Sequence, residues 1–157
     1  MAFEIERKFL VDHSKWKALA KPEGRYLRQG YLTDRKEATI RVRLDGDKAF
    51  ITIKGATTGI SRKEFEYEIP AEDGTELLNE FAPAAIEKVR FDIIFEGKLW
   101  EVDEFLGDNA GLIVAEIELT NENEHFVLPD WVSAEVSHDA RYFNANLLKN
   151  PFRSWSR

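Results

Sequence analysis

The sequence predicts a mainly β domain with a few flanking helices (an α+β chain), and two observations predict this fold class. Polar and apolar residues alternate in short segments along most of the 157 residues, which is typical of half-buried strands. Turn-forming groups such as Asp45-Gly46-Asp47 and Glu96-Gly97-Lys98 separate neighbouring segments, so neighbours are expected to pair as hairpins. The length fits one domain, and we assign residues 1–157 to it.

The alternating segments give the expected strands in order. They are Phe3–Val11, Arg25–Thr33, Ala38–Leu44, Lys48–Lys54, Ser61–Ile69, Glu87–Glu96, Lys98–Leu106, Leu112–Leu119 and Val132–Glu135. Helical signals are fewer. They predict helices over Ser14–Ala20, which ends before Pro22, over Thr75–Phe81 with Thr75 as a possible cap, and over Ala140–Leu148 after a capping Asp139.

Composition excludes several classes of function. The 22 Lys and Arg residues against 29 Asp and Glu give a net charge of −7, which argues against general binding to nucleic acid or to an anionic membrane. Without cysteine there is no disulfide framework, thiolate metal site or cysteine nucleophile. The three histidines, His13, His125 and His138, show no metal-ligand spacing. Because no secretory signal or long apolar run is recognisable, we expect a cytoplasmic protein.

The polar faces of the expected strands are almost entirely charged. Successive side chains of a strand point to opposite faces, so Glu4, Glu6 and Lys8 share one face. The same spacing recurs in Arg41-Val42-Arg43, Thr52-Ile53-Lys54, Glu64-Phe65-Glu66-Tyr67-Glu68, Lys88-Val89-Arg90, Glu101-Val102-Asp103 and Glu116-Ile117-Glu118. Any one of these strands fits an ordinary solvent-facing surface with ion pairs between strands. Their number, and the scarcity of neutral polar residues among them, argue for a ligand.

The charges are segregated by sign, which indicates two kinds of ligand. The basic set, Arg41, Arg43, Lys54, Lys88 and Arg90, calls for a polyanion, because like charges two residues apart repel each other. The acidic set calls for hard cations such as Mg²⁺, Mn²⁺ or Ca²⁺, and it comprises Glu4, Glu6, Asp103, Glu116 and Glu118. A phosphate chain held with magnesium satisfies both sets. A closed or nearly closed antiparallel barrel with its charges inward would bring them together.

The segment EIERKFLV at the start of the chain resembles the hallmark strand of the CYTH family, also called triphosphate tunnel metalloenzymes. Further segments resemble the family in order: LRQGYL, IRVR, TIKG, SRKEFEYEI, EKVRF, WEVDEF, AEIEL and EVSHDARYFNANL. The resemblance implies a closed eight-stranded antiparallel β-barrel that forms a charged tunnel and binds triphosphate with a divalent metal. The segments are most similar to small bacterial members that hydrolyse inorganic triphosphate. One departure is His138, where members commonly have glycine.

The resemblance also implies roles for single residues. Lys8, Arg41, Arg43, Lys54, Lys88 and Arg90 are expected to bind phosphate oxygens. Mg²⁺ or Mn²⁺ is expected at Glu4, Glu6, Glu116 and Glu118, helped by Asp103 or Glu66, while Glu64 and Glu101 support the basic residues. For proton removal we expect Lys54 with Tyr31, because a lysine crowded by other cations loses its proton nearer neutral pH. Lys8 is a further candidate catalytic residue. The alternatives are packing for Tyr31 and phosphate binding for Lys54.

The expected function is therefore metal-dependent hydrolysis of inorganic triphosphate to diphosphate and phosphate. Alternatives within the family are a class IV adenylyl cyclase, a thiamine-triphosphatase and a nucleoside triphosphatase. An alternative outside the enzymes is a polyphosphate-binding module without enzymatic activity. The expected partner is a small-molecule triphosphate, not nucleic acid or a membrane, and the expected oligomeric state is a monomer or a homodimer.

Overall fold

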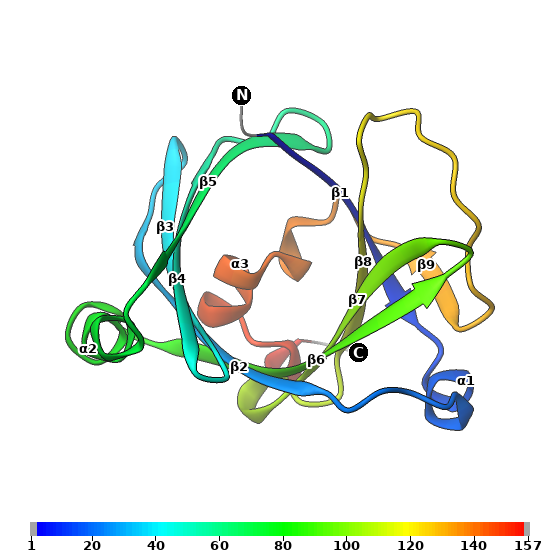
Figure 1. The fold of residues 1–157 in the computed structure, drawn as a ribbon, viewed down its shortest axis with the longest axis horizontal. Coiled ribbons are helices and arrows are strands. Elements are labelled where there is room, and N and C mark those ends of the chain that lie inside the picture. The colour runs from blue at the N-terminus through cyan, green and yellow to red at the C-terminus, as the bar shows by residue number, and fades with distance from the viewer. Residues whose placement is uncertain (1–2, 156–157) are drawn as a thin grey trace.

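A computed structural model describes residues 3–155, without the side chain of Asp34, and its architecture is a barrel (Figure 1). The strands are β1 (Phe3–Val11), β2 (Arg25–Asp34), β3 (Ala38–Asp45), β4 (Lys48–Gly55), β5 (Ser61–Ile69), β6 (Ala85–Phe95), β7 (Lys98–Phe105), β8 (Ile113–Glu118) and β9 (Val132–Glu135). Each expected strand is present, with its ends shifted by at most two residues. The mainly β prediction is confirmed.

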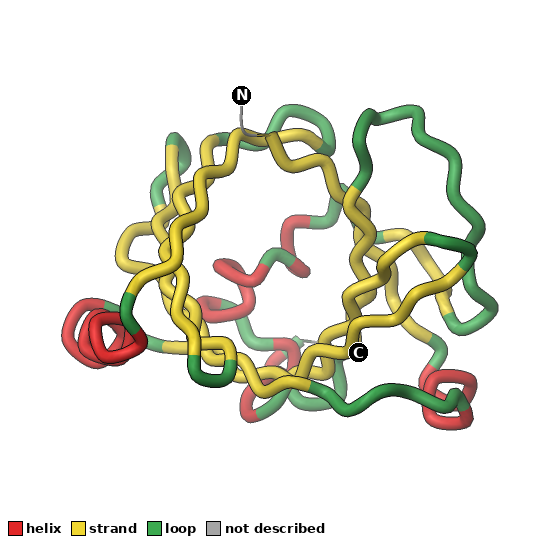
Figure 2. The backbone as a smooth tube through the Cα atoms, viewed as in Figure 1, coloured by secondary structure: helices red, strands yellow, loops and turns green. Residues whose placement is uncertain are grey.

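The barrel closes through β1. The strands follow the order β5-β4-β3-β2-β6-β7-β8-β1, and β1 pairs back onto β5 with Phe3 opposite Lys63. All these pairings are antiparallel, so the predicted closed eight-stranded barrel is confirmed (Figure 2). The second half of β1 leaves β5 and pairs instead with β9, where Phe9 lies opposite Glu135. β9 is therefore an extra strand beside the barrel.

The helices are α1 (His13–Ala18), α2 (Ala71–Phe81) and α3 (Asn144–Lys149), with short 3-10 turns η1 (Gly107–Asn109), η2 (Ala140–Tyr142) and η3 (Phe152–Ser154). The predicted start of the second helix was wrong. α2 begins at Ala71 after an extended Pro70, with Glu72 and Asp73 in the first turn, where the helix dipole favours acids. Thr75 lies inside the helix, and its hydroxyl donates to the carbonyl of Ala71 at 3.1 Å.

The single helix predicted over Ala140–Leu148 is divided in two. Phe143 has an extended backbone, with ψ 134°, and it separates η2 from α3. Asp139 does act as a cap, since its side chain accepts from the backbone N–H of Arg141, but the turn it caps is η2. After the break, α3 lies across one end of the barrel (Figure 1). No described helix is long and apolar enough to cross a membrane.

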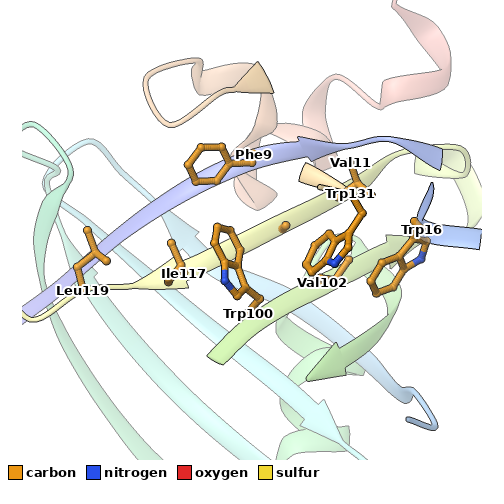
Figure 3. Close-up of a cluster of buried hydrophobic side chains, with 9 residues drawn as sticks. Phe9, Val11, Trp16, Trp100, Val102, Ile117, Leu119 and Trp131 are labelled. Carbon is orange, nitrogen blue, oxygen red and sulfur yellow. The ribbon is translucent and has the colours of Figure 1, made fainter. Parts of the chain in front are cut away.

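Hydrophobic packing lies mainly outside the barrel wall. The largest cluster joins the outer faces of β1, β7 and β8 to Trp16 and Trp131 (Figure 3). On the opposite wall, α2 packs against β2, β3 and β4 through Gly74 and Leu78. A second apolar cluster closes the end of the barrel at which α3 lies. It includes Ile86, Phe105 and Val114 from the strands and the fully buried Leu147 from α3. Charged side chains occupy the rest of the barrel interior.

Candidate active site in the barrel interior

Strand register places opposite charges next to each other inside the barrel. Lys8 lies opposite Glu116, Lys54 opposite Glu64, and Arg90 opposite Asp103. Side chains on directly opposed positions of antiparallel strands are close enough to interact. Each strand carries mainly one sign of charge on this face, and neighbouring strands place the opposite sign beside it. This pairing lowers the free-energy cost of keeping the charges inside the barrel.

A cavity of about 440 Å³ occupies the interior between α3 and the hairpin loops β2–β3 and β4–β5. This volume lies in the range of small-molecule sites. The predicted site residues that line it are Glu4, Glu6, Lys8, Tyr31, Arg41, Lys54, Lys88, Arg90 and Glu116. Other predicted residues belong to the same barrel but not to the lining of this cavity: Arg43, Glu64, Glu66, Glu101, Asp103 and Glu118.

The cavity also contains residues that the sequence did not single out. Among them are Lys36, Arg62, Ser137 and Asn144. Arg62 shares a strand face with Glu64, so the two-residue spacing was a sufficient signal for it. Asn144 had no such signal, because it reaches the cavity only where α3 crosses the end of the barrel.

Lys8 is held between two carboxylates. Its ammonium lies 2.6 Å from Glu116 Oε1 and 3.1 Å from Glu6 Oε1. Burial alone would lower the pKa of Lys8, but Glu116 and Glu6 outweigh burial and raise it. Burial also opposes ionisation of Glu6, but Lys8 outweighs it and holds the pKa of Glu6 below its usual value. Lys8 is thus a permanent cation here, suited to binding an anion and not to accepting a proton.

Lys54 lies between Glu4, at 3.0 Å, and Glu64, at 3.3 Å. The predicted crowding of Lys54 by other cations is not found at contact distance, where its partners are carboxylates. Burial, followed by the hydrogen bond from Glu64, raises the pKa of Glu4.

Asp103 organises two cations. It is 1% exposed, and its carboxylate accepts from Arg90 at 2.8 and 2.9 Å and lies 2.7 Å from the Lys88 ammonium. Burial would raise the pKa of Asp103, yet Arg90 and Lys88 lower it to about 2. Burial lowers the pKa of Lys88 to about 8 despite Asp103. Both oxygens of Asp103 are engaged by cations, an arrangement that differs from the metal-ligand role expected from the sequence.

Arg41 and Arg43 have unused hydrogen-bonding capacity. They lie 3.5 and 3.6 Å from oxygens of Glu66, but the Nε of each is buried without a partner among residues 3–155. Burial and the neighbouring Arg41 lower the pKa of Arg43. A buried guanidinium donor without an acceptor is costly, so this wall of the barrel favours an anion.

Glu118 is exposed, whereas Glu4 is buried and Glu6 and Glu116 are half-buried. Glu118 lies opposite Glu6, and its carboxylate has no hydrogen bond or ion pair with any residue that the structure describes. Burial raises the pKa of Glu118, and Glu4 and Glu6 raise it further. Within residues 3–155, no group of three or more acidic or histidine side chains is arranged to hold a metal ion as it stands. Glu4, Glu6 and Glu116 are paired with Lys8 or Lys54, but the four β1 and β8 carboxylates together carry more negative charge than these two lysines offset.

Together these features define a class of protein: a closed β-barrel with an interior site for a multivalent anion, beside carboxylates suited to a hard cation.

Similarity to known proteins narrows this class. The CYTH domain profile matches residues 2–149. A protein of Acetivibrio thermocellus named inorganic triphosphatase is 50% identical over 156 residues, which cover 99% of each chain. An inorganic triphosphatase of Nitrosomonas europaea is 35% identical and covers 92% of this chain and 95% of its own.

A solved structure supports the same family. The crystal structure of an inorganic triphosphatase, 32% identical, superposes with a TM-score of 0.63 and covers 92% of this chain and 96% of its own. The chain belongs to the CYTH family.

Proposed function

We propose that this protein hydrolyses inorganic triphosphate to diphosphate and phosphate inside the barrel, with the help of a divalent cation. The observation that carries the proposal is the cavity, which is lined by Lys8, Arg41, Lys54, Lys88 and Arg90 and has the volume of a small-molecule site. The relatives named inorganic triphosphatase, one of them 50% identical over nearly the whole chain, support the choice of substrate.

Membership in the family implies a divalent cation, and the residues present fit one. Glu4, Glu6, Glu116 and Glu118 offer the oxygen donors that Mg²⁺ and Mn²⁺ prefer. Burial, with smaller contributions from neighbouring carboxyl groups, raises the pKa of Glu4 and Glu118, and a bound cation would favour the ionised form of both. A bound divalent ion supplies charge neutralisation of phosphate oxygens and a lower pKa for coordinated water.

The basic side chains bind the substrate and stabilise the charge that develops in phosphoryl transfer. Such reactions depend mostly on positioning and on electrostatic stabilisation of the transferred and leaving phosphate oxygens. Arginines offer paired N–H donors to these oxygens, while lysines act as point charges. In this mechanism Asp103 has a positioning role, because its contacts fix Lys88 and Arg90 within the wall of the tunnel.

For the proton of the attacking water we propose Lys54 together with Tyr31 as the acceptor. Both side chains line the cavity. Tyr31 is half-buried, and its hydroxyl oxygen accepts from the Gln29 amide only at 3.5 Å, so it is weakly engaged within the protein.

One parallel assay tests the proposed function. The purified protein is offered inorganic triphosphate, ATP and thiamine triphosphate with Mg²⁺ or Mn²⁺, and phosphate and cyclic AMP are both measured. We expect phosphate release from inorganic triphosphate to be fastest and to stop in EDTA. Faster production of cyclic AMP from ATP would show a cyclase instead, and binding of triphosphate without turnover of any substrate would show a binding module.

A further inference from the structure

Asn144 lies where the C-terminal helix meets the tunnel. It is the first residue of α3, and its side chain lines the cavity together with Lys88 and Arg90. Leu147, one turn further along, is fully buried in the apolar cluster that closes this end of the barrel. Residues three apart share one side of a helix, so the anchoring of Leu147 also directs Asn144 toward the barrel.

The orientation of the Asn144 amide follows from its neighbours. Its Oδ1 accepts a hydrogen bond from Lys88 Nζ at 2.9 Å and another from Gln29 Nε2 at 3.2 Å. An ammonium group has donors and no acceptor, so the atom that faces Lys88 must be the carbonyl oxygen. The Nδ2 group, with two N–H donors, therefore faces elsewhere. It has no acceptor among the residues that the structure describes.

Lys88, like Asn144, has an N–H donor without a hydrogen-bonding partner among the described residues. Its ammonium has three N–H donors, and its hydrogen-bonding partners within residues 3–155 are Asp103 at 2.7 Å and Asn144. Lys88 is 1% exposed, yet it belongs to the cavity wall. The third N–H of Lys88 and the Nδ2 donors of Asn144 are therefore available to an acceptor bound in the cavity that both residues line.

We propose that Asn144 is a substrate-contacting residue: its Nδ2 donates a hydrogen bond to a non-bridging phosphate oxygen while its Oδ1 holds the Lys88 ammonium in place. The proposal rests on the proposed function, since it takes inorganic triphosphate as the ligand. Ionised phosphate oxygens are acceptors only, so they match an amide N–H. A neutral amide also adds a donor beside Lys88 and Arg90 without adding a third positive charge.

Two substitutions separate substrate contact from a purely structural role. Asn144→Asp keeps the size of the side chain and the oxygen that accepts from Lys88 and Gln29, but it replaces the N–H donors with a negative oxygen. Asn144→Ala removes both functions. If Asn144 contacts phosphate, the aspartate variant binds more weakly than the alanine variant, because a carboxylate repels the substrate. If Asn144 only positions Lys88, the order is reversed.

The readouts are the Kd of tripolyphosphate by calorimetry in EDTA, and KM and kcat with Mg²⁺. We expect Asn144→Ala to raise Kd and KM about 10- to 100-fold, as for the loss of one hydrogen bond to a charged group, and Asn144→Asp to raise them further. The matched controls are Asn150→Ala and Asn150→Asp. Asn150 is exposed just after α3, lies outside the cavity lining and accepts from the Ser154 hydroxyl, so these variants should match the wild type. Thermal unfolding of each variant confirms that it is folded.

The outcomes distinguish this proposal from the proposed function. If the wild type hydrolyses tripolyphosphate and Asn144→Asp retains wild-type Kd and KM, the contact is overturned and the activity stands. If the wild type binds tripolyphosphate without hydrolysing it, the proposed function is overturned and the order of the two Kd values still decides on Asn144. A wild type that binds no tripolyphosphate overturns both.

Discussion

Single residues inside the barrel have roles that their neighbours determine, and three lysines illustrate this. Lys8 lies between two carboxylates that raise its pKa. Lys88 is so deeply buried that its pKa falls to about 8 although it contacts Asp103. Lys54 contacts Glu4 and Glu64. The sequence shows three similar basic positions, but in the fold burial brings the pKa of Lys88 to about 8, near the pH at which a hydrolase commonly works.

The choice of proton acceptor can be tested through the pH dependence of the rate. If Lys54 accepts the proton, Lys54→Ala should abolish the rise in kcat/KM on the alkaline side, since the activity of a lysine base rises as it loses its proton. Arg41→Ala should lower kcat/KM at every pH and leave the shape of the curve unchanged.

Two further comparisons keep this test specific. Lys88→Arg provides a side chain that stays charged throughout, so an alkaline limb lost in Lys88→Arg and retained in Lys54→Ala would contradict the assignment to Lys54. Metal-bound water also titrates in this range, so each curve is measured again with Mn²⁺ in place of Mg²⁺.

Asp103 should be important for stability as well as activity. Asp103→Asn keeps the shape of the side chain but leaves Lys88 and Arg90 without their shared buried counter-ion. Removal of one partner from a buried ion pair costs about 3–5 kcal/mol. We therefore expect urea unfolding to show a loss of this order, while the exposed Asp108→Asn matches the wild type. An unchanged unfolding midpoint would show that the two cations are compensated elsewhere.

Glu118, unlike Asp103, should be important for activity but not for stability. Glu118→Gln withdraws a charge that Glu4 and Glu6 repel, so the melting temperature in EDTA should stay constant or rise. If Glu118 binds the cation, kcat/KM at limiting Mg²⁺ should fall at least about tenfold and recover in part at high Mg²⁺. Near-normal turnover at limiting Mg²⁺ would exclude this ligand role. Glu80→Gln on the exposed side of α2 is the control.

At the scale of secondary structure, the strands were predictable and the C-terminal helix was not. β1 and β5 have the predicted ends because alternation of charged and apolar residues is a local signal. The break at Phe143 depends on tertiary packing: Tyr142 and Leu147 are both buried in the same apolar cluster. The resulting position of α3 brings Asn144 to Lys88, a contact between residues 56 positions apart that no local pattern encodes. The contacts of Asp103 likewise depend on register across strands.

The packing of α2 on the barrel gives a test of an element remote from the cavity. A Cβ on Gly74 would lie 2.6 Å from Cβ of Ala49 on β4, too close for either backbone to remain in place. Gly74→Ala should therefore lower the free energy of unfolding by about 1–3 kcal/mol, although alanine is the better helix former. Ala49→Gly removes the clashing atom, so the double variant should be more stable than Gly74→Ala alone. Activity per folded molecule should not change, and a destabilisation that Ala49→Gly does not relieve would point to a different cause.

For the whole molecule, the barrel has hydrophobic packing on its outside and charge on its inside. Trp16, Trp100 and Trp131 stabilise the outer wall through tilted and edge-on ring contacts at 5.3 and 6.0 Å (Figure 3). The interior carries charges that are partly compensated between strands and partly left for ligands. Without ligands, the folded state therefore contains repulsion that the unfolded chain does not have, and its stability should respond to pH and to divalent cations together.

The direction of the pH response follows from the carboxyl groups. Burial raises the folded-state pKa of Glu4, Glu101 and Glu118, so in EDTA these groups take up protons in the folded protein before they do in the unfolded chain. The free energy of unfolding should therefore rise as the pH falls from 7 toward their raised pKa values. Asp103 acts in the opposite sense: its folded pKa of about 2 gives stability above the ordinary aspartate pKa, and this is lost as the pH falls through the folded value.

The two effects predict a stability maximum below pH 7 when metal is absent. Melting temperatures measured from pH 8 to pH 3 in EDTA should show it, and Glu118→Gln should reduce the rise on its neutral side. Mg²⁺ at pH 7 should raise the melting temperature, and by less as the pH falls toward the ordinary glutamate pKa, because protonated carboxyl groups are poorer ligands. A melting temperature that falls steadily as the pH is lowered from 7 to the ordinary glutamate pKa in EDTA would contradict the view that Glu4, Glu101 and Glu118 limit stability, because their protonation would then bring no gain.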